Sequence, residues 1–263
     1  MPRLAIGLEY DGTPFCGWQR QGHARSIQAE VEAALSRVAD APLSVAAAGR
    51  TDAGVHAIGQ VAHFDTLAVR PLHAWLRGAN SLLPPEISLA WVQPVGDFFD
   101  ARRSAIARTY HYLILNQVAR PALHRQRASW VRGELDVAAM QAAAPALLGE
   151  HDFSAFRAAA CQARSPMRAL HKLEIRRAGP CISVECRASG FLHHMVRNIV
   201  GSLLRIGRGE SPPGWLAEVL ASRDRRAAGM TAPATGLYLG RVHYPPALGI
   251  PAPPPFMAGD LWP

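Results

Sequence analysis

The stretch CISVECRASGFLHHMVRNIVGSLLRIGRG, Cys181 to Gly209, changes its hydrophobic period halfway along. Ile182, Val184 and Cys186 alternate with polar residues, which is typical of a strand with one buried face. After the paired histidines, apolar residues recur at helical spacing, at Met195, Val196, Ile199, Val200, Leu203 and Leu204. A half-buried strand followed by an amphipathic helix predicts an antiparallel sheet with helices on one face.

The polar face of this predicted helix carries His194, Arg197, Arg205 and Arg208 and no acid. Gly201 lies among them and, lacking a Cβ, would let another backbone approach closely. The face is therefore more basic than solubility requires.

Similar patterns extend outward on both sides. Ser26 is a plausible N-cap for a helix with an apolar stripe from Ile27 to Val38, Pro71 can open a second helix, and Asp136 can cap a third through Leu148. The strands predicted from alternation or β-rich composition are 4–10, 60–65, 107–116, 181–191 and 236–244. Together these elements indicate an α+β fold, followed by a loose Pro-rich tail.

The composition is that of an ordinary globular chain. It has 263 residues, 49% of them hydrophobic, which suffices for one large or two small domains. It contains no apolar run long enough to span a membrane and no signal peptide after Met1, so we expect a cytoplasmic protein. Its four cysteines lack zinc or disulfide spacing and are expected to be reduced and mostly buried.

The formal net charge is +8, carried almost entirely by arginine, since Lys172 is the only lysine. Guanidinium groups suit forked phosphate contacts and stacking on bases. This charge favours a polyanionic partner, although GC-rich codons also produce arginine-rich chains.

Common cofactor and nucleophile motifs are absent, including the P-loop, the dinucleotide fingerprint, HExxH and GxSxG. The closest histidine sets, His56 with His63 and His193 with His194, lack a neighbouring third ligand. We therefore predict no metal and no cofactor.

A second stretch, GRTDAGVHAIGQVAHFDT from Gly49 to Thr66, places Arg50, Thr51 and Asp52 between two glycines. In an extended segment residues two apart share a face, so Arg50 and Asp52 could project into one cleft. The commoner use of an Asp near Gly, in a turn or a local ion pair, fits these residues as well.

This second stretch resembles the catalytic-aspartate motif of the tRNA pseudouridine synthase A family. Six further motifs resemble the family in the same order, covering the chain from about Leu8 to Pro245. They are LEYDGTPFCGWQRQ, SIQAEVEAAL, FDARRSAIARTYHYLI, HDFSAFRAAACQARSP, GFLHHMVRNIVGSLLRIG and TAPATGLYLGRVHYP.

The resemblance implies that uridine is isomerised to pseudouridine at positions 38, 39 and 40 of the anticodon arm of tRNA. Such an isomerisation needs no cofactor or metal, but it does need a base lifted from its stack and a basic surface. The family fold is two ferredoxin-like halves forming an extended, mostly antiparallel sheet around a central basic cleft, in a homodimer. We place the halves at 1–105 and 106–245, with a tail at 246–263.

The resemblance also assigns residues. Asp52 matches the essential carboxylate, Arg197 its cationic partner, and Tyr110 the residue that stacks on the flipped uracil. Arg50 matches the arginine entering the RNA stack, and Leu237 a pocket leucine. Arg205, on the basic helix face, is a further candidate for substrate binding.

His111 departs from the family pattern, because a basic residue is expected between the two tyrosines. It should point away from Tyr110 on a strand, so we expect the chemistry to survive. Three alternatives stay open: a non-catalytic tRNA-binding protein, a synthase acting on another RNA, and a hydrolase using Asp52 with water.

Overall fold

The computed structural model describes residues 1–22 and 24–256. By their contacts they form two units: an N-terminal unit of Met1–Ile106 with Tyr238–Pro255, and a C-terminal unit of Ala107–Leu237 with Phe256. The sequence boundary instead placed residues 238–245 with the second half. Among the described residues, no helix has the length and hydropathy needed to cross a bilayer.

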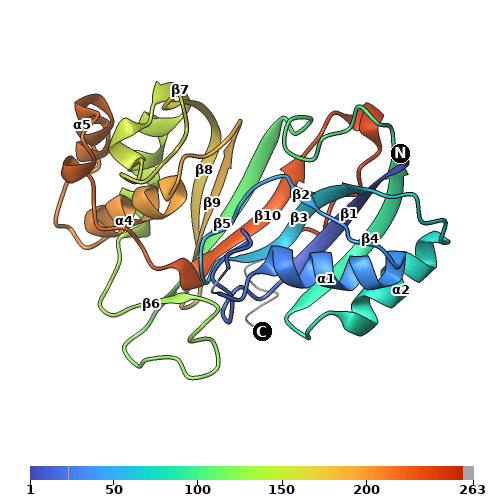
Figure 1. The fold of residues 1–263 in the computed structure, drawn as a ribbon. Coiled ribbons are helices and arrows are strands. Elements are labelled where there is room, and N and C mark those ends of the chain that lie inside the picture. Colours follow the sequence, from blue (N-terminus) through green and yellow to red (C-terminus); the bar gives the residue numbers. More distant parts are fainter. Residues whose placement is uncertain (23, 257–263) are drawn as a thin grey trace. The chain divides into compact units, whose positions relative to one another are not determined.

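The strands of the N-terminal unit are ordered β4–β1–β3–β10 (Figure 1). The strands are β1 (Arg3–Tyr10), β2 (Ala46–Ala47), β3 (His56–Asp65), β4 (Ile87–Val95) and β10 (Leu237–His243). β1 lies antiparallel to both β3 and β4, β2 is antiparallel to β3, and β10 joins β3 in parallel at Tyr238 and His56. β4 was not predicted. It carries Pro94, which an edge strand tolerates.

Two helices pack together in this unit, α1 (Ile27–Ala39) and α2 (Leu72–Leu82), and α2 also packs on β4. Ser26 caps α1 as predicted, since its side chain accepts a hydrogen bond from the backbone N–H of Ala29. Pro71 is the N-cap of α2 rather than its first helical residue.

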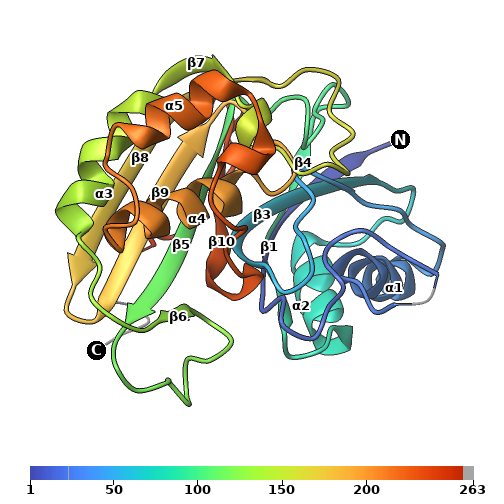
Figure 2. The same ribbon diagram turned by 90° about the vertical axis from the view of Figure 1, so that its left-hand side faces the viewer.

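The strands of the C-terminal unit are ordered β5–β9–β8–β7 and are antiparallel (Figure 2). Their bounds are β5 (Ala107–Asn116), β7 (Gly149–Asp152), β8 (Met167–Ala178) and β9 (Cys181–Ala188). The short β6 (Ser129–Val131) pairs in parallel with β5. β8 was missed because a register shift between Leu170 and Lys172 breaks the alternation of its buried residues.

The helices of this unit are α3 (Val137–Ala143), α4 (Met195–Gly207) and α5 (Trp215–Ser222). α3 packs against α4 and β8. Asp136 caps α3 as predicted, but the α-helix ends at Ala143 and continues as a 3₁₀ turn, η1 (Ala144–Leu147), that contains Pro145. Proline cannot donate the next helical hydrogen bond, which explains why the helix predicted through Leu148 is shorter. Three further 3₁₀ turns are η2 (Ser154–Phe156), η3 (Arg225–Ala227) and η4 (Ala234–Gly236).

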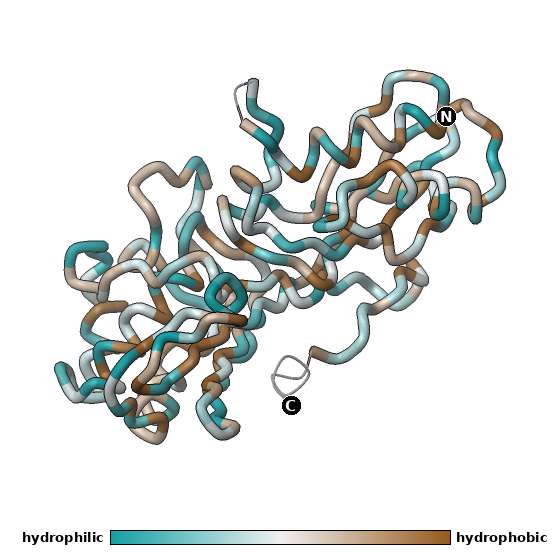
Figure 3. The backbone as a smooth tube through the Cα atoms, turned by 90° about the horizontal axis from the view of Figure 1, so that it is seen from below, coloured by the Kyte–Doolittle hydropathy of each residue, from teal (hydrophilic) through white to brown (hydrophobic). Residues whose placement is uncertain are grey.

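The α+β class and the mostly antiparallel pairing are thus confirmed. Figure 3 shows hydrophobic and hydrophilic residues interspersed along the backbone of both units. The expectation of mostly buried thiols holds for Cys181 and Cys186, whereas Cys16 is exposed and Cys161 is half-buried.

The Pro-rich tail belongs to the N-terminal unit as far as Pro255. It forms the short turn η5 (Pro246–Leu248), and the side chain of Gln93 donates to the carbonyl of Gly249. Residues 257–263 of the predicted tail lie outside the described residues.

Candidate active site

The loop that carries Asp52 is held by the loop that follows β1. The backbone N–H of Trp18 donates to the carbonyl oxygen of Thr51 at 3.0 Å. Gly17 has a φ of +85°, and a Cβ there would lie 2.6 Å from that same carbonyl oxygen. A Cβ at Gly12 would collide with the carbonyl oxygen of Val55. Only glycine at these two positions allows the two loops to approach this closely.

A buried hydrogen-bond network from strands β1 and β3 also fixes this loop. The hydroxyl of Tyr10 shares a 2.9 Å hydrogen bond with the hydroxyl of Thr51. The side-chain amide of Gln60 donates to the Tyr10 hydroxyl at 3.3 Å and to the carbonyl of Gly49 at 2.7 Å. Burial raises the pKa of Tyr10 to about 12, so its hydroxyl keeps its proton at neutral pH.

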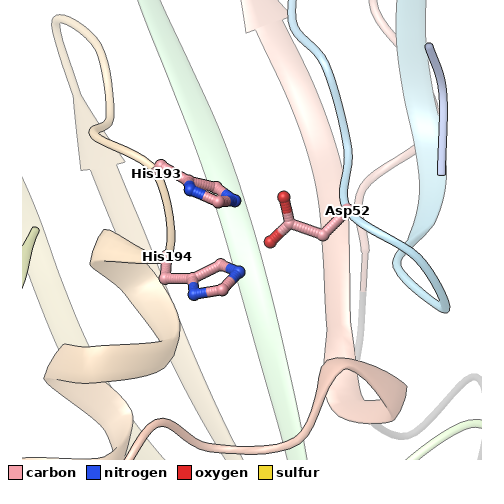
Figure 4. A group of neighbouring side chains, drawn as sticks. All are labelled: Asp52, His193 and His194. Atoms are coloured by element: carbon pink, nitrogen blue, oxygen red, sulfur yellow. The ribbon is translucent and has the colours of Figure 1, made fainter. Parts of the chain in front are cut away.

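Arg50 and Asp52 lie outside β3, which begins only at His56. Solvent exposure nevertheless alternates along this loop: Arg50 is exposed, Thr51 is buried and Asp52 is half-buried. Gly54 has a φ of +76°, which lets the chain turn from this loop into β3. The side chain of Asp52 projects from the loop (Figure 4). The backbone that carries it is held by the hydrogen bonds from Trp18 and Tyr10 to Thr51.

Arg197 lies on the first turn of α4 and is paired with Ala232. Its carbonyl accepts from the N–H of Ala232 at 3.1 Å, and its own Nε–H donates to the carbonyl of Ala232 at 2.7 Å. Ala232 belongs to residues 225–232, which we call the strap. The carbonyl of Ala232 therefore orients this guanidinium, while its N–H ties the strap to the backbone of α4.

The strap itself is tied to α4 through Asn198. The Oδ1 atom of Asn198 accepts from Arg225 at 3.0 Å and from the hydroxyl of Thr231 at 2.6 Å. A Cβ at Gly201 would collide with the carbonyl oxygen of Met230, so the absence of a side chain permits the contact. The close approach expected at Gly201 is thus made by the strap.

The remaining predicted residues occupy ordinary structural positions. Tyr110 on β5 packs edge-to-face against Phe191, with ring centroids 5.0 Å apart. Leu237 is buried where β10 begins. The guanidinium of Arg205 lies 4.8 Å from the ring centroid of Trp215.

His111 is half-buried, and its ring centroid lies 4.6 Å from that of Phe256. Burial lowers its pKa, a shift that Glu185 partly opposes and Lys172 reinforces. His111 therefore favours its neutral form more than an exposed imidazole does.

The paired histidines precede α4. The ring centroids of His193 and His194 lie 4.0 Å apart with the ring planes tilted by 42°, and the backbone of His194 is left-handed, with a φ of +61° (Figure 4). Sequence reasoning placed His194 on the polar helix face, whereas it is the N-cap residue of α4.

Sequence reasoning also missed the supports of the candidate site. The loop of Asp52 is held by Tyr10 and Gln60, and the strap that contacts Arg197 is held by Arg225. In the sequence these three residues look like ordinary core or surface residues. A useful signal was the pair Gly12 and Gly17, since two glycines flanking an aromatic turn indicate a close backbone approach.

Known proteins resemble this chain over nearly its whole length. A family model described as tRNA pseudouridine synthase matches residues 7–102 and 143–245. The tRNA pseudouridine synthase A of Methylococcus capsulatus is 54% identical over 94% of this chain and 92% of its own length. Those of Nitrosococcus oceani and Aeromonas hydrophila are 54% and 53% identical, over 95% and 99% of this chain and 96% of each relative.

Proposed function

The chain belongs to the tRNA pseudouridine synthase family, and from this premise we propose that Asp52 is its essential carboxylate. The enzyme is an isomerase that forms pseudouridine in tRNA. We further propose that its targets are uridines 38, 39 and 40 of the anticodon stem-loop, because seven motifs in order resemble the family that modifies these positions.

One observation supports Asp52 most strongly: its loop is anchored from two directions, by the Gly12–Trp18 loop and by Tyr10 with Gln60. A carboxylate is a weak nucleophile, so its placement matters more than its basicity. A rigid loop that leaves a carboxylate half-exposed meets this requirement.

The reaction breaks the bond between N1 of uracil and C1′ of ribose and forms a bond between C5 and C1′. N1 gains a proton and C5 loses one, so the change is redox-neutral. Asp52 assists departure of the base, by attack on the sugar or the ring or by promoting a glycal. Arg197 is proposed as the cationic partner of this carboxylate.

Tyr110, Arg50 and Leu237 are proposed to receive the flipped uridine. Tyr110 would stack on the uracil, Leu237 would pack against it, and Arg50 would occupy the stack that the base has left. Arg205 is a weaker candidate, because its guanidinium already lies over Trp215. The homodimer implied by the resemblance and the cytoplasmic location expected from the sequence stay predictions.

Tritium release from tRNA labelled at C5 of uridine tests this proposal. Asp52→Asn should abolish release and leave tRNA binding within a few-fold of wild type. Asp97→Asn, at an exposed acid in the same unit, is the matched control and should release tritium normally. Wild-type turnover in Asp52→Asn would refute the assignment.

Tritium release, product analysis and mapping of modified sites together separate the rivals. A non-catalytic binder releases neither tritium nor uracil, a hydrolase yields free uracil, and a synthase for another RNA leaves uridines 38 to 40 unmodified in mapped tRNA.

A further inference from the structure

A basic loop connects β5 to the start of α3. Residues 117–133, which we call the basic loop, contain four arginines and one histidine and no Asp or Glu; these are Arg120, His124, Arg125, Arg127 and Arg132. All four arginines are exposed. The loop lies between the two ranges that the family model matches, so that match assigns it no role.

The ends of the loop are anchored. Trp130 Nε1 donates to the carbonyl of Gln117 at 2.9 Å, and Asn116 Nδ2 donates to the carbonyls of Val131 and Gly133 at 3.1 and 2.5 Å. β6 pairs with β5 just inside these contacts. The loop is visible as the green segment beside β6 in Figures 1 and 2.

Its tip is organised as well. The N–H groups of Arg127 and Ala128 both donate to the carbonyl of His124, and Arg125 donates to the carbonyl of Ala122. These contacts make a local turn that carries its arginines on a defined backbone. Less ordering entropy is then lost when a ligand binds them.

We propose that the basic loop binds the sugar-phosphate backbone of the tRNA substrate. Exposed guanidiniums in a segment that contains no acid suit a row of phosphate groups, because each guanidinium can bind one phosphate through two N–H groups. The proposal rests on tRNA being the substrate and is independent of the role given to Asp52.

The apolar residues of the loop support RNA rather than a second copy of the chain. Val118 and Leu123 are 77% and 88% exposed and lie among the arginines, where each can pack against a ribose or a base. Two copies of this loop would bring arginines against arginines, and like charges disfavour such a contact.

The experiment is tRNA binding measured by fluorescence anisotropy over a range of KCl concentrations. Each phosphate contact that is lost lowers the slope of log K against log salt by roughly 0.7 to 0.9. The variant Arg120→Ser/Arg125→Ser/Arg132→Ser should therefore lower the slope by roughly 2 to 3 and weaken binding at least tenfold in low salt.

Two further variants sharpen the result. Arg37→Ser/Arg70→Ser/Arg77→Ser removes three exposed arginines from the N-terminal unit and should leave the slope close to wild type. Lysine at the three loop positions should restore most of the slope, because the slope depends on charge. Circular dichroism spectra and melting curves establish that every variant is folded.

An unchanged slope in the loop variant, or an equal drop in the control, would overturn the proposal. A change in molecular mass by light scattering, with the slope unaltered, would identify the loop as a contact between copies and would also overturn it. If the loop variant loses slope while wild type releases no tritium, the proposed chemistry fails and the binding loop stands.

Discussion

The Nε–H of Arg197 donates to the carbonyl oxygen of Ala232, and the N–H of Ala232 donates back to the carbonyl of Arg197. The distances are 2.7 and 3.1 Å. A lysine has no equivalent of Nε, so it would keep the charge and lose this orientation.

Arg197→Lys is therefore expected to lower kcat by about tenfold to a hundredfold, with little change in tRNA affinity, because misplacement of a reacting partner is costly. Steady-state tritium release measures kcat, and anisotropy measures affinity. A lysine variant with the wild-type rate would mean that charge alone suffices at this position.

Gly201→Ala should destabilise the protein by roughly 1 to 3 kcal/mol, as overpacking of a close contact does. The added methyl group would collide with the carbonyl of Met230 and push the strap off α4. Gly214→Ala is the control, because Gly214 has a φ of −62° and, among the described residues, nothing lies within 4 Å of the position that a Cβ would take. Thermal melting should separate the two variants, and equal melting temperatures would contradict the strap contact.

Tyr10→Phe should reduce the decrease in the free energy of unfolding that occurs as the pH rises above 10. Burial raises the pKa of Tyr10 from 10.0 to about 12, so the protonated phenol favours the folded state. Its contribution is fully present below pH 10 and is lost as the pH rises through about 12.

Urea unfolding at pH 8 and at pH 11 measures this difference. The wild type should lose more free energy of unfolding between the two values than the variant does. At pH 8 the variant should be less stable by about 1 to 3 kcal/mol, because Thr51 and Gln60 each lose a buried partner. Identical pH dependence in both proteins would show that another group dominates.

Tyr110→Phe keeps the ring that packs edge-to-face on Phe191 and removes only the hydroxyl. If the phenol helps to remove the C5 proton, tritium release should slow by about a hundredfold, within the usual range for general acid–base catalysis. Tyr110→Leu, which also loses the stacking face, should bind tRNA less tightly. An unchanged rate in the Phe variant would remove the phenol from the mechanism.

Local composition and hydrophobic periodicity predicted several regular elements well. The strand at 107–116 agrees with β5, and α4 begins at the first residue of the predicted apolar stripe. β8 was missed because a bulge after Leu170 disrupts the alternation, and a charge-rich strand offers no other local signal.

The candidate site was predictable only in part. The resemblance supplied Asp52, Arg197 and Tyr110, whereas spacing alone left Asp52 open between a cleft residue and an ordinary turn residue. The contacts that hold these residues join positions far apart in the chain, such as Tyr10 with Thr51 and Asn198 with Arg225. Pairings of this kind leave no periodic trace in a single sequence.

The parallel pairing of β10 with β3 has a consequence for synthesis on the ribosome. Tyr238 pairs beside His56, and the N–H of Ile106 donates to the carbonyl of His243. During synthesis the N-terminal unit lacks this strand, so the backbone of β3 near His56 stays unpaired until the whole C-terminal unit has been made. An unpaired strand edge can pair with other chains. A chain terminated before Tyr238 would therefore expose an aggregation-prone edge next to the loop that carries Asp52.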